Sequence, residues 1–245
     1  MVTGASRGIG RGMAERLAAE GALVAVHYFN SATAAGEVVD SIRSRGGDAF
    51  TLRTELGVPG DAEALYTALD AELARRGTEP TLDILVNNAA VSGSARLHEV
   101  TPELVDRIFS VNVTSLLFVI QEGVRRMGEG GRIINISSAV TRVAYPESVV
   151  YSMSKGAMDT LTIALAKELG PRRITVNTVS PGFVATDMNA GLRSTPAGAA
   201  RLADMSVFNR IGEPSDIAGI VAFLASPDSQ WMTGQRIEVS GGSHL

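Results

Sequence analysis

The chain has 245 residues, of which 45% are hydrophobic and 20% charged, and its formal net charge is −4. This length predicts one large domain with a substantial core, and the absence of cysteine excludes disulfides and thiolate metal sites. The histidines His27, His98 and His244 have no metal-ligand spacing, and the charge pattern argues against nucleic acid as the main partner. We find neither a membrane-span pattern nor a secretory-signal pattern, so we expect a cytoplasmic protein without a metal.

Short apolar runs alternate with longer amphipathic segments along the chain, the pattern of repeated βαβ units on a parallel sheet. In chain order, the predicted strands cover residues 23–28, 49–53, 83–86, 132–137, 174–179 and 236–239. The predicted helices cover residues 8–20, 33–45, 61–76, 102–127, 150–169 and 214–225. Doubly wound sheets bind ligands beyond the carboxyl ends of their strands, so residues that follow these strands are the first candidates for a site.

A glycine-rich turn, Thr3-Gly4-Ala5-Ser6-Arg7-Gly8-Ile9-Gly10, lies between a short apolar start and a helical pattern. Its glycines permit a tight turn, close approach of the backbone to a pyrophosphate and close packing of the following helix. The N-terminal N–H groups and the dipole of that helix favour an anion. The turn therefore predicts a phosphate-binding site.

Tyr151 and Lys155 lie four residues apart in a predicted helix, and Ser138 lies thirteen positions before Tyr151. Because a helix repeats its face every 3.6 residues, the phenol and the ammonium project from the same side. The ammonium is expected to stabilise the phenolate and so to lower the pKa of Tyr151. With the Ser138 hydroxyl, the two groups predict a site that acts on a carbonyl, although the pair alone would sooner indicate a solvated helix face.

Six motifs of this chain resemble the short-chain dehydrogenase/reductase family in their order and spacing. They are the glycine-rich turn, Asn87-Asn88-Ala89-Ala90, Asn112, Ser138, Tyr151 with Lys155, and Pro181-Gly182. The resemblance runs from Met1 to Leu245. It implies a single α/β domain over residues 1–245, with a Rossmann-type, doubly wound parallel sheet of about seven strands and helices on both faces. It also implies an oxidoreductase that transfers a hydride between NADPH and a carbonyl or secondary alcohol.

The resemblance assigns roles to four residues. Tyr151 is the general acid or base, and Ser138 hydrogen-bonds the carbonyl oxygen. Lys155 holds the nicotinamide ribose and lowers the pKa of Tyr151, and Asn112 keeps a water chain from that lysine to solvent. Asn112 could instead bond a backbone group, and Ser137 is the alternative to Ser138, which we prefer for its spacing from Tyr151.

The stretch His27-Tyr28-Phe29-Asn30-Ser31 bears on the choice of cofactor. Family members that prefer NAD carry an acidic residue here for the adenosine ribose hydroxyls, and this chain lacks one. With Arg7 in the turn, the stretch resembles that of NADPH-preferring members, because a guanidinium suits a dianionic phosphate. We expect NADP(H) and leave NAD(H) open. The alternative is that Arg7 is solvated and that Asn30 and Ser31 cap the next helix, and His27 is expected to serve strand packing.

By the same resemblance, Glu55 stands where the family usually has Asp, and Ala90 stands where Gly is common and a positive φ is easier. The residues expected to bind the cofactor are Gly4, Ser6, Arg7, Gly8, Ile9, Gly10, Tyr28, Asn30, Ser31, Glu55, Leu56, Asn88, Ala89, Ala90, Tyr151, Lys155, Pro181, Gly182, Val184 and Thr186.

The segment at about 187–209 resembles the mobile lid of the family's substrate pocket, and its small and apolar residues suggest an apolar substrate. The opposite wall, or ordinary loop packing, is expected from Val140, Val143, Ala144 and Tyr145. The resemblance is closest to 3-oxoacyl-carrier-protein reductases and to polyketide, naphthol and sugar-type ketoreductases. The alternatives are another alcohol dehydrogenase of the family and a catalytically silent NADPH-binding scaffold. An acidic carrier protein could meet the basic residues Arg125, Arg126, Arg172 and Arg173.

The family commonly forms tetramers through two long helices and its last strand, so we expect a homotetramer that buries the segment ending at Leu245. Trp231 is expected in that interface or in the core. Only Met1 and Val2 precede the glycine-rich turn, where family members have most of a central strand. Either the chain tolerates a short central strand, or Met1 is an internal methionine or a misplaced start. We expect four or five apolar, β-branched residues added before Met1 to raise the melting temperature.

Overall fold

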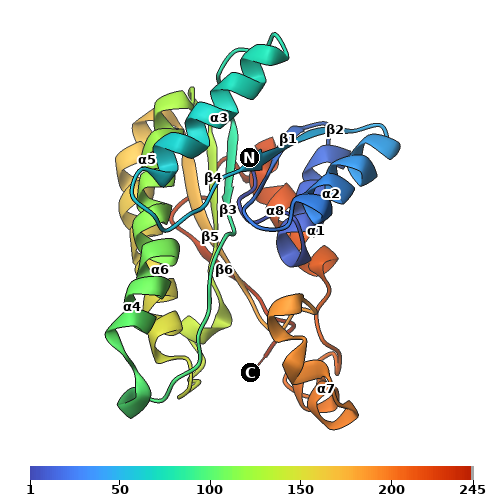
Figure 1. The fold of residues 1–245 in the computed structure, drawn as a ribbon, viewed down its shortest axis with the longest axis vertical. Coiled ribbons are helices and arrows are strands. Elements are labelled where there is room, and N and C mark those ends of the chain that lie inside the picture. The colour runs from blue at the N-terminus through green and yellow to red at the C-terminus, as the bar shows by residue number, and fades with distance from the viewer. Residues whose placement is uncertain (244–245) are drawn as a thin grey trace.

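A parallel β-sheet crosses the centre of the molecule, and helices cover both of its faces (Figure 1). The computed structural model describes residues 1–243, so His244 and Leu245, at the end of the predicted interface segment, lie outside the described residues. Its strands are β1 (Leu23–Tyr28), β2 (Asp48–Arg53), β3 (Ile84–Asn87), β4 (Arg132–Ile136), β5 (Thr175–Pro181) and β6 (Arg236–Val239). Its helices are α1 (Gly8–Ala19), α2 (Ala32–Ser44), α3 (Asp61–Arg75), α4 (Pro102–Phe109), α5 (Leu116–Arg126), α6 (Val149–Leu169), α7 (Pro196–Ala203) and α8 (Pro214–Ala225).

Each face of the sheet has its own hydrophobic core. Helices α1, α2 and α8 bury their apolar side chains on one face, and α3, α5 and α6 bury theirs on the other. Successive side chains of a strand point to opposite faces, so Val24 and Val26 of β1 join the first core and Ala25 joins the second. This burial on both faces explains why the strands form nearly continuous apolar runs in the sequence.

Val2 joins the two parts of the sheet, β2-β1 on one side and β3-β4-β5-β6 on the other. It forms parallel bridges with Val26 of β1 and Val86 of β3. Its N–H donates to the Ala25 carbonyl at 3.0 Å, and its own carbonyl accepts from His27 N at 3.1 Å. A single bridge residue thus stands between β1 and β3, where the sequence predicted a shortened central strand, and residues 1–243 form six longer strands.

The predicted α/β fold is confirmed, and most predicted elements lie within two residues of their observed bounds. The helix predicted over residues 102–127 is wrong in one respect. It is divided into α4 and α5 by a π-helical segment, Ser110–Ser115. The amphipathic pattern continues through this segment, and the wider turn re-aims Asn112 inward, where it is 1% exposed.

A row of buried polar side chains fixes α6 to the sheet. Asn87 Nδ2 donates to Asn135 Oδ1 at 2.9 Å, and Asn135 Nδ2 donates to Thr162 Oγ1 at 2.9 Å. The Thr162 and Thr178 hydroxyls then lie 2.8 Å apart. Because buried polar groups are costly unless paired, the row specifies one register of α6 over β3, β4 and β5. Among residues 1–243, no helix is both long and apolar enough to cross a membrane.

Candidate active site

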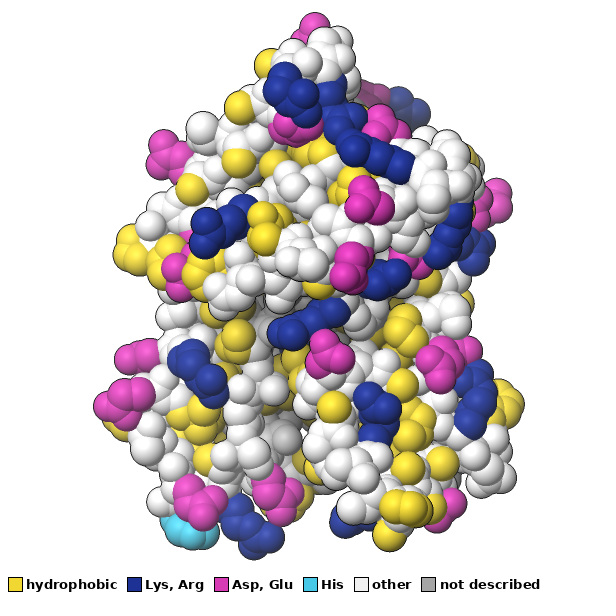
Figure 2. All heavy atoms as spheres, turned by 45° about the vertical axis from the view of Figure 1, so that its right-hand side comes forward, with side chains coloured by type: hydrophobic (Ala, Val, Ile, Leu, Met, Phe, Trp, Pro, Cys, Tyr) yellow, Lys and Arg dark blue, Asp and Glu magenta, His cyan; other side chains and the backbone are white. Residues whose placement is uncertain are grey.

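The predicted site residues gather at the carboxyl ends of the strands. Gly4 follows Val2, Asn88 follows β3, Ser138 follows β4 and Gly182 follows β5. In Figure 1 this edge faces downward, with the segment that contains α7 on one side and the start of α4 on the other. Figure 2 shows that the surface is hollowed at this end, between two lobes.

Ser138, Tyr151 and Lys155 meet at this edge. Tyr151 and Lys155 lie one turn apart on α6, and the Lys155 Nζ is 5.7 Å from the centroid of the Tyr151 ring. The same Nζ donates to the Ile136 carbonyl at the end of β4, at 2.7 Å. The Ser138 side chain is hydrogen-bonded to the Tyr151 phenol. Ser137, the alternative, is buried, and its hydroxyl reaches the Lys155 carbonyl at 3.5 Å. The geometry favours Ser138 as the partner of Tyr151.

Burial dominates the titration of both groups on α6. It raises the pKa of Tyr151 to about 12, against a smaller lowering by the hydrogen bond with Ser138. It lowers the pKa of Lys155 to about 8, and the charge of Asp159 opposes that change. The loss of solvation thus outweighs the hydrogen bond with Ser138, and the pKa of Tyr151 rises. The stabilisation of the phenolate by Lys155 stays a prediction. Tyr151 is a protonated phenol throughout the neutral range.

Asn112 links the loop after β3 to α6. Its Oδ1 accepts from Val91 N at 2.9 Å, and its Nδ2 donates to the Val91 carbonyl at 2.9 Å and to Ser154 Oγ at 3.0 Å. Ser154 Oγ in turn donates to the Tyr151 carbonyl at 2.7 Å. The side chain thus bonds backbone groups, as the alternative interpretation allowed, and it also braces the helix that carries Tyr151. The water chain expected from Asn112 stays a prediction.

The glycine-rich turn forms a cradle that side chains would fill. Gly4 and Gly8 have φ of 62° and 56°, in the left-handed region that favours glycine. A Cβ on Gly10 would lie 2.3 Å from the Gly4 carbonyl oxygen and 2.6 Å from Asn88 Nδ2. Helix α1 begins at Gly8, so its first N–H groups lie directly behind this turn, as an anion site requires.

Two residues outside the predicted set hold the turn in place. Thr3 Oγ1 accepts from Asn88 N at 2.9 Å and from Ala89 N at 3.0 Å, and Asn88 Nδ2 donates to the Thr3 and Gly4 carbonyls. His27 Nδ1 accepts from Gly4 N at 3.1 Å. The sequence marked Thr3 only as part of the motif, and it assigned His27 to packing. The sequence did carry one sign of this role for His27. A polar side chain in an otherwise apolar, buried strand needs a hydrogen-bond partner.

Arg7 and Ser31 lie at the predicted adenosine end. Ser31 precedes α2 but makes no side-chain capping bond, so the capping interpretation fails for it. Arg7 is largely exposed, with its Nη1 3.6 Å from Asp187 Oδ2, so both interpretations of Arg7 stay open. Arg53, which the sequence did not mark, donates from Nε to the Phe29 carbonyl at 3.3 Å. A second guanidinium therefore stands beside this stretch.

The loop after β5 approaches the glycine-rich turn from the other side. A Cβ on Gly8 would lie 3.1 Å from Thr186 Cγ2, and Val184 is 4% exposed. Two residues that sequence reasoning missed hold this loop. Asn189 Nδ2 donates to the Val184 carbonyl at 2.7 Å, and Arg193 donates to the Thr186 carbonyl at 2.8 Å. Their positions in the segment 187–209 gave no signal of this role.

The remaining predicted cofactor residues line the same edge with different exposure. Ser6 and Pro181 are buried, and Tyr28 and Leu56 are partly buried. Glu55 and Asn30 are exposed. Ala90 does not have a positive φ, so the alanine there is unstrained. Among residues 1–243, no group of acidic, histidine or cysteine side chains is arranged to hold a metal ion.

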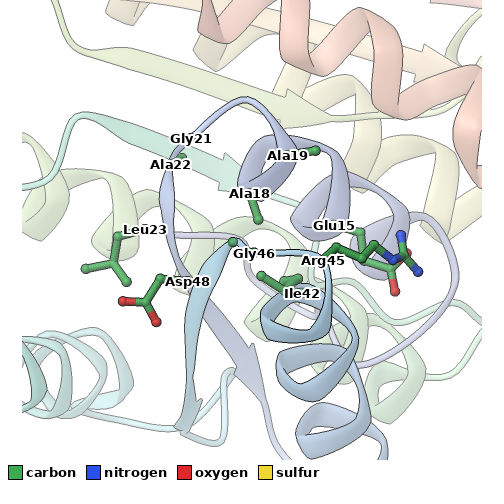
Figure 3. A pocket seen from close by; sticks show the side chains of 11 residues that line it. Glu15, Ala18, Ala19, Gly21, Ala22, Leu23, Ile42, Arg45, Gly46 and Asp48 are labelled. Carbon is green, nitrogen blue, oxygen red and sulfur yellow. The ribbon is translucent and has the colours of Figure 1, made fainter.

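A pocket of about 380 Å³ lies elsewhere, between α1 and α2 at the opposite ends of β1 and β2 (Figure 3). Its charged lining is internally paired, because Arg45 Nη1 lies 3.5 Å from Glu15 Oε2. None of the predicted site residues lines it. Its distance from the glycine-rich turn and from α6 leaves the carboxyl edge of the sheet as the candidate site.

Comparisons with known proteins found relatives that match almost the whole chain. A family model described as enoyl-(acyl carrier protein) reductase matches residues 4–244. Versicolorin reductase stcU of Emericella nidulans is 40% identical over 254 residues, which cover 99% of this chain and 94% of that protein. The angucycline C-6 ketoreductase LanV, solved with bound NADP, is 50% identical with a TM-score of 0.94, covering 98% of this chain and 93% of that one. LanV has also been solved with NADP and rabelomycin. LugOII, a promiscuous reductase that catalyses keto-reduction at C1 during lugdunomycin biosynthesis, is 49% identical with a TM-score of 0.96, covering 100% and 96%.

Proposed function

This chain belongs to the short-chain dehydrogenase/reductase family and is an NADP-dependent oxidoreductase, and from that premise we propose that it reduces a ketone on a polycyclic aromatic molecule of the polyketide type. The observation that carries the proposal is the meeting of three groups at the carboxyl edge of the sheet. The Ser138 hydroxyl bonds the Tyr151 phenol, and the Lys155 ammonium lies 5.7 Å from the phenol ring. This set suits proton donation to a carbonyl oxygen.

The side chains divide the chemistry of reduction among them. Bound NADPH supplies the hydride for the carbonyl carbon. Tyr151 gives its hydroxyl proton to the carbonyl oxygen, and its pKa of about 12 keeps that proton available at neutral pH. Ser138 hydrogen-bonds the same oxygen and stabilises the negative charge that develops there. The phenolate left on Tyr151 is stabilised by the neighbouring Lys155 ammonium, and oxidation of an alcohol runs the same steps in reverse.

The residues present fit NADP(H). Gly4, Gly8 and Gly10 leave the space that a pyrophosphate needs against the start of α1. At the adenosine end, the 2′-phosphate would be bound by Arg7, Arg53 and the Ser31 hydroxyl, which makes no helix-capping bond. Lys155 would hold the nicotinamide ribose, and Val184 and Thr186 would meet the nicotinamide half.

Apolar and aromatic side chains support an aromatic substrate. In the segment 187–209, Met188, Leu192, Val207 and Phe208 are each more than half exposed. On the other side of the site, the Tyr145 and Phe183 rings form an edge-to-face pair with centroids 5.9 Å apart. Flat apolar ligands bind well against such surfaces. The relatives named as an angucycline C-6 ketoreductase and as a catalyst of keto-reduction during lugdunomycin biosynthesis support the same substrate class.

A carrier-bound substrate is less well supported. The four basic residues that could meet an acidic carrier protein already have partners within the chain. Arg126 pairs with Asp70 at 2.7 Å, and Arg125 and Arg173 pair with Glu122 and Glu129. Arg172 donates to the Val124 and Met127 carbonyls. Because these guanidinium groups would have to exchange existing bonds for new ones, we favour a free aromatic ketone.

We also retain four proposals about organisation: one domain over residues 1–245, a lid at about 187–209, a cytoplasmic location and a homotetramer. Exposed Leu117 and Phe118 on α5, with Met153 and Ile163 on α6, support a tetramer that pairs these helices. Trp231 is 97% exposed, so the alternative that places it in the core is wrong.

The test is a panel of ketones with NADPH oxidation as the readout, comparing rabelomycin-type and hydroxynaphthalene substrates with a 3-oxoacyl thioester. The wild type should turn over the aromatic ketones, and Tyr151→Phe should lose roughly 10²–10⁴-fold in kcat/KM. NADPH binding, followed by its fluorescence, should stay within about twofold in the variant, because the ring remains. If Tyr151→Phe kept more than about a tenth of the activity, the role of Tyr151 would be refuted. Turnover of the thioester alone would refute the aromatic substrate.

A further inference from the structure

Asp159 is a partly buried acid one turn beyond Lys155, on the same face of α6. Its side chain is 17% exposed, and its Oδ1 is buried without a hydrogen-bond partner. A buried carboxylate oxygen that lacks a partner is destabilising, typically by about 1–3 kcal/mol. Such a group calls for an explanation other than packing.

Pairing with Arg236 does not provide that explanation. Arg236 Nε lies 3.8 Å from Asp159 Oδ2, which is longer than a hydrogen bond, whereas its Nη2 donates to Glu238 Oε2 at 3.1 Å. Arg236 therefore has a better partner on its own strand. Asp159 keeps a negative charge that this arginine neutralises only in part.

Asp159 faces the sheet beneath α6, where two charged side chains of β6 also lie. Thr178 of β5 bonds Thr162 of α6, so alternate residues of β5 face this helix. Arg236 pairs in register with Thr178, and Glu238 pairs with Ser180, so both charged side chains of β6 point to the same side. Ser180 Oγ is also buried without a partner, which marks this layer as polar and incompletely paired.

The charged and titratable groups around Lys155 are few. On α6 itself they are Tyr151 and Asp159, and Asp159 is the charge that acts on the Lys155 ammonium against its burial. The other elements packed against α6 carry Arg236 and Glu238 of β6, and Arg142 after β4, whose Nη1 lies 3.5 Å from Glu238 Oε2. They also carry the exposed Glu103, Asp106 and Arg107 of α4, and Arg172 in the turn after α6.

We propose that Asp159 is a positioning residue for Lys155: its carboxylate is the fixed counter-charge that keeps the buried ammonium protonated beside Tyr151. Lys155 is 2% exposed, and its Nζ bonds a neutral carbonyl, which supplies no charge. Without Asp159, the ammonium would lose its proton more readily, and the phenolate formed on Tyr151 would lose its stabilising cation. This inference rests on the proposed function, in which Lys155 acts as a cation.

The composition of the chain allows the charge on Lys155 to be measured directly. Its only lysines are Lys155 and Lys167, and Lys167 lies exposed on the same helix. With ¹³C-labelled lysine, an NMR titration of the ligand-free protein follows two side chains, one of which is an internal reference. In Asp159→Asn the midpoint of Lys155 should fall by about one pH unit, and that of Lys167 should not move. Asp159→Glu should restore most of the difference.

Two further variants keep the test decisive. Arg236→Gln removes a competing cation at a partly exposed strand, so it should raise the Lys155 midpoint even if Asp159→Asn folds poorly. Asp106→Asn removes an exposed carboxylate from α4 and should leave the midpoint unchanged. Equal midpoints in the wild type, Asp159→Asn and Arg236→Gln would overturn the proposal.

The pH profile of ketone reduction gives the functional readout. The alkaline fall of kcat/KM should move to lower pH in Asp159→Asn, by the same amount as the NMR midpoint. A merely structural role would lower kcat/KM at every pH without shifting the pH at which it falls in the alkaline range. That result would also overturn the proposal. Failure of every ketone to react would instead refute the proposed function, while the NMR titration would still decide the role of Asp159.

Discussion

His27 makes the stability of the fold depend on pH through a single buried imidazole. The ring is 3% exposed, and its Nδ1 accepts from Gly4 N while its Nε2 lies 3.0 Å from the Thr54 carbonyl. Nε2 must therefore carry the proton of a neutral ring. Burial lowers the pKa of His27 from its ordinary value of 6.5 to about 4, and the bond to Thr54 raises it only in part.

The sign of the effect follows from proton counting. Between pH 6.5 and about pH 4 the unfolded chain binds a proton on this ring that the folded chain does not, so the free energy of unfolding falls as the pH falls. The difference of about 2.5 pH units is worth about 3 kcal/mol. The full contribution is present above the unfolded pKa and is lost by the time the pH reaches the folded pKa. Against a total stability of roughly 5–15 kcal/mol, this loss is large.

Urea denaturation of the wild type and His27→Gln measures this contribution, because Gln keeps a polar side chain but does not titrate. Between about pH 7 and about pH 4.5, the wild type should lose about 2–3 kcal/mol more than the variant. Carboxylates titrate equally in both proteins and cancel in the comparison. Equal losses would show that His27 is not neutral in the folded chain, and the reasoning from its hydrogen bonds would fail.

Two other predictions concern the cofactor cradle. Arg7→Ala and Ser31→Ala should each weaken NADPH binding by about one to two decades, because a charged hydrogen bond is worth roughly 1.5–3 kcal/mol, and should leave NADH binding nearly unchanged. Equal losses with both cofactors, measured by fluorescence titration, would show that neither residue reads the 2′-phosphate. Gly10→Ala should cost about 1–3 kcal/mol of stability and weaken NADPH binding, because its Cβ would meet the Gly4 carbonyl oxygen at 2.3 Å. Gly36→Ala in α2 is the matched control, since nothing lies within 4 Å of that Cβ, and thermal unfolding should show it slightly stabilised.

The fold could be predicted from the sequence where buried apolar residues recur at regular spacing along a helix or strand. The runs at 23–28 and 236–239 are apolar or alternate regularly, and both became strands with the predicted bounds. The break at Ser110–Ser115 was not predictable in the same way. A single wider turn shifts the helical face without removing any apolar residue, so the periodicity on both sides still reads as one helix.

The site could be predicted where its geometry is local. Tyr151 and Lys155 share a helix, and four-residue spacing is enough to place them on one face. Thr3 and Asn88 bond each other across 85 residues of sequence, and no pattern within either segment shows that contact. The depth of burial of Tyr151 could not be predicted for the same reason. It is a property of the assembled layers, and it raises the pKa of Tyr151 more than the hydrogen bond with Ser138 lowers it.

Neutral amide side chains connect the loops at the carboxyl edge of the sheet. Their lack of charge affects how the site responds to pH. Asn88 ties the glycine-rich turn to β3, Asn112 ties the next loop to α6, and Asn189 supports the loop after β5. An amide both donates and accepts, so it can join two backbone segments without burying a charge. Because these braces do not titrate, a pH change should leave the arrangement of the loops intact and act on the few ionisable groups inside. The pH dependence of turnover between neutral and alkaline conditions should therefore report on Lys155 rather than on a rearranged site.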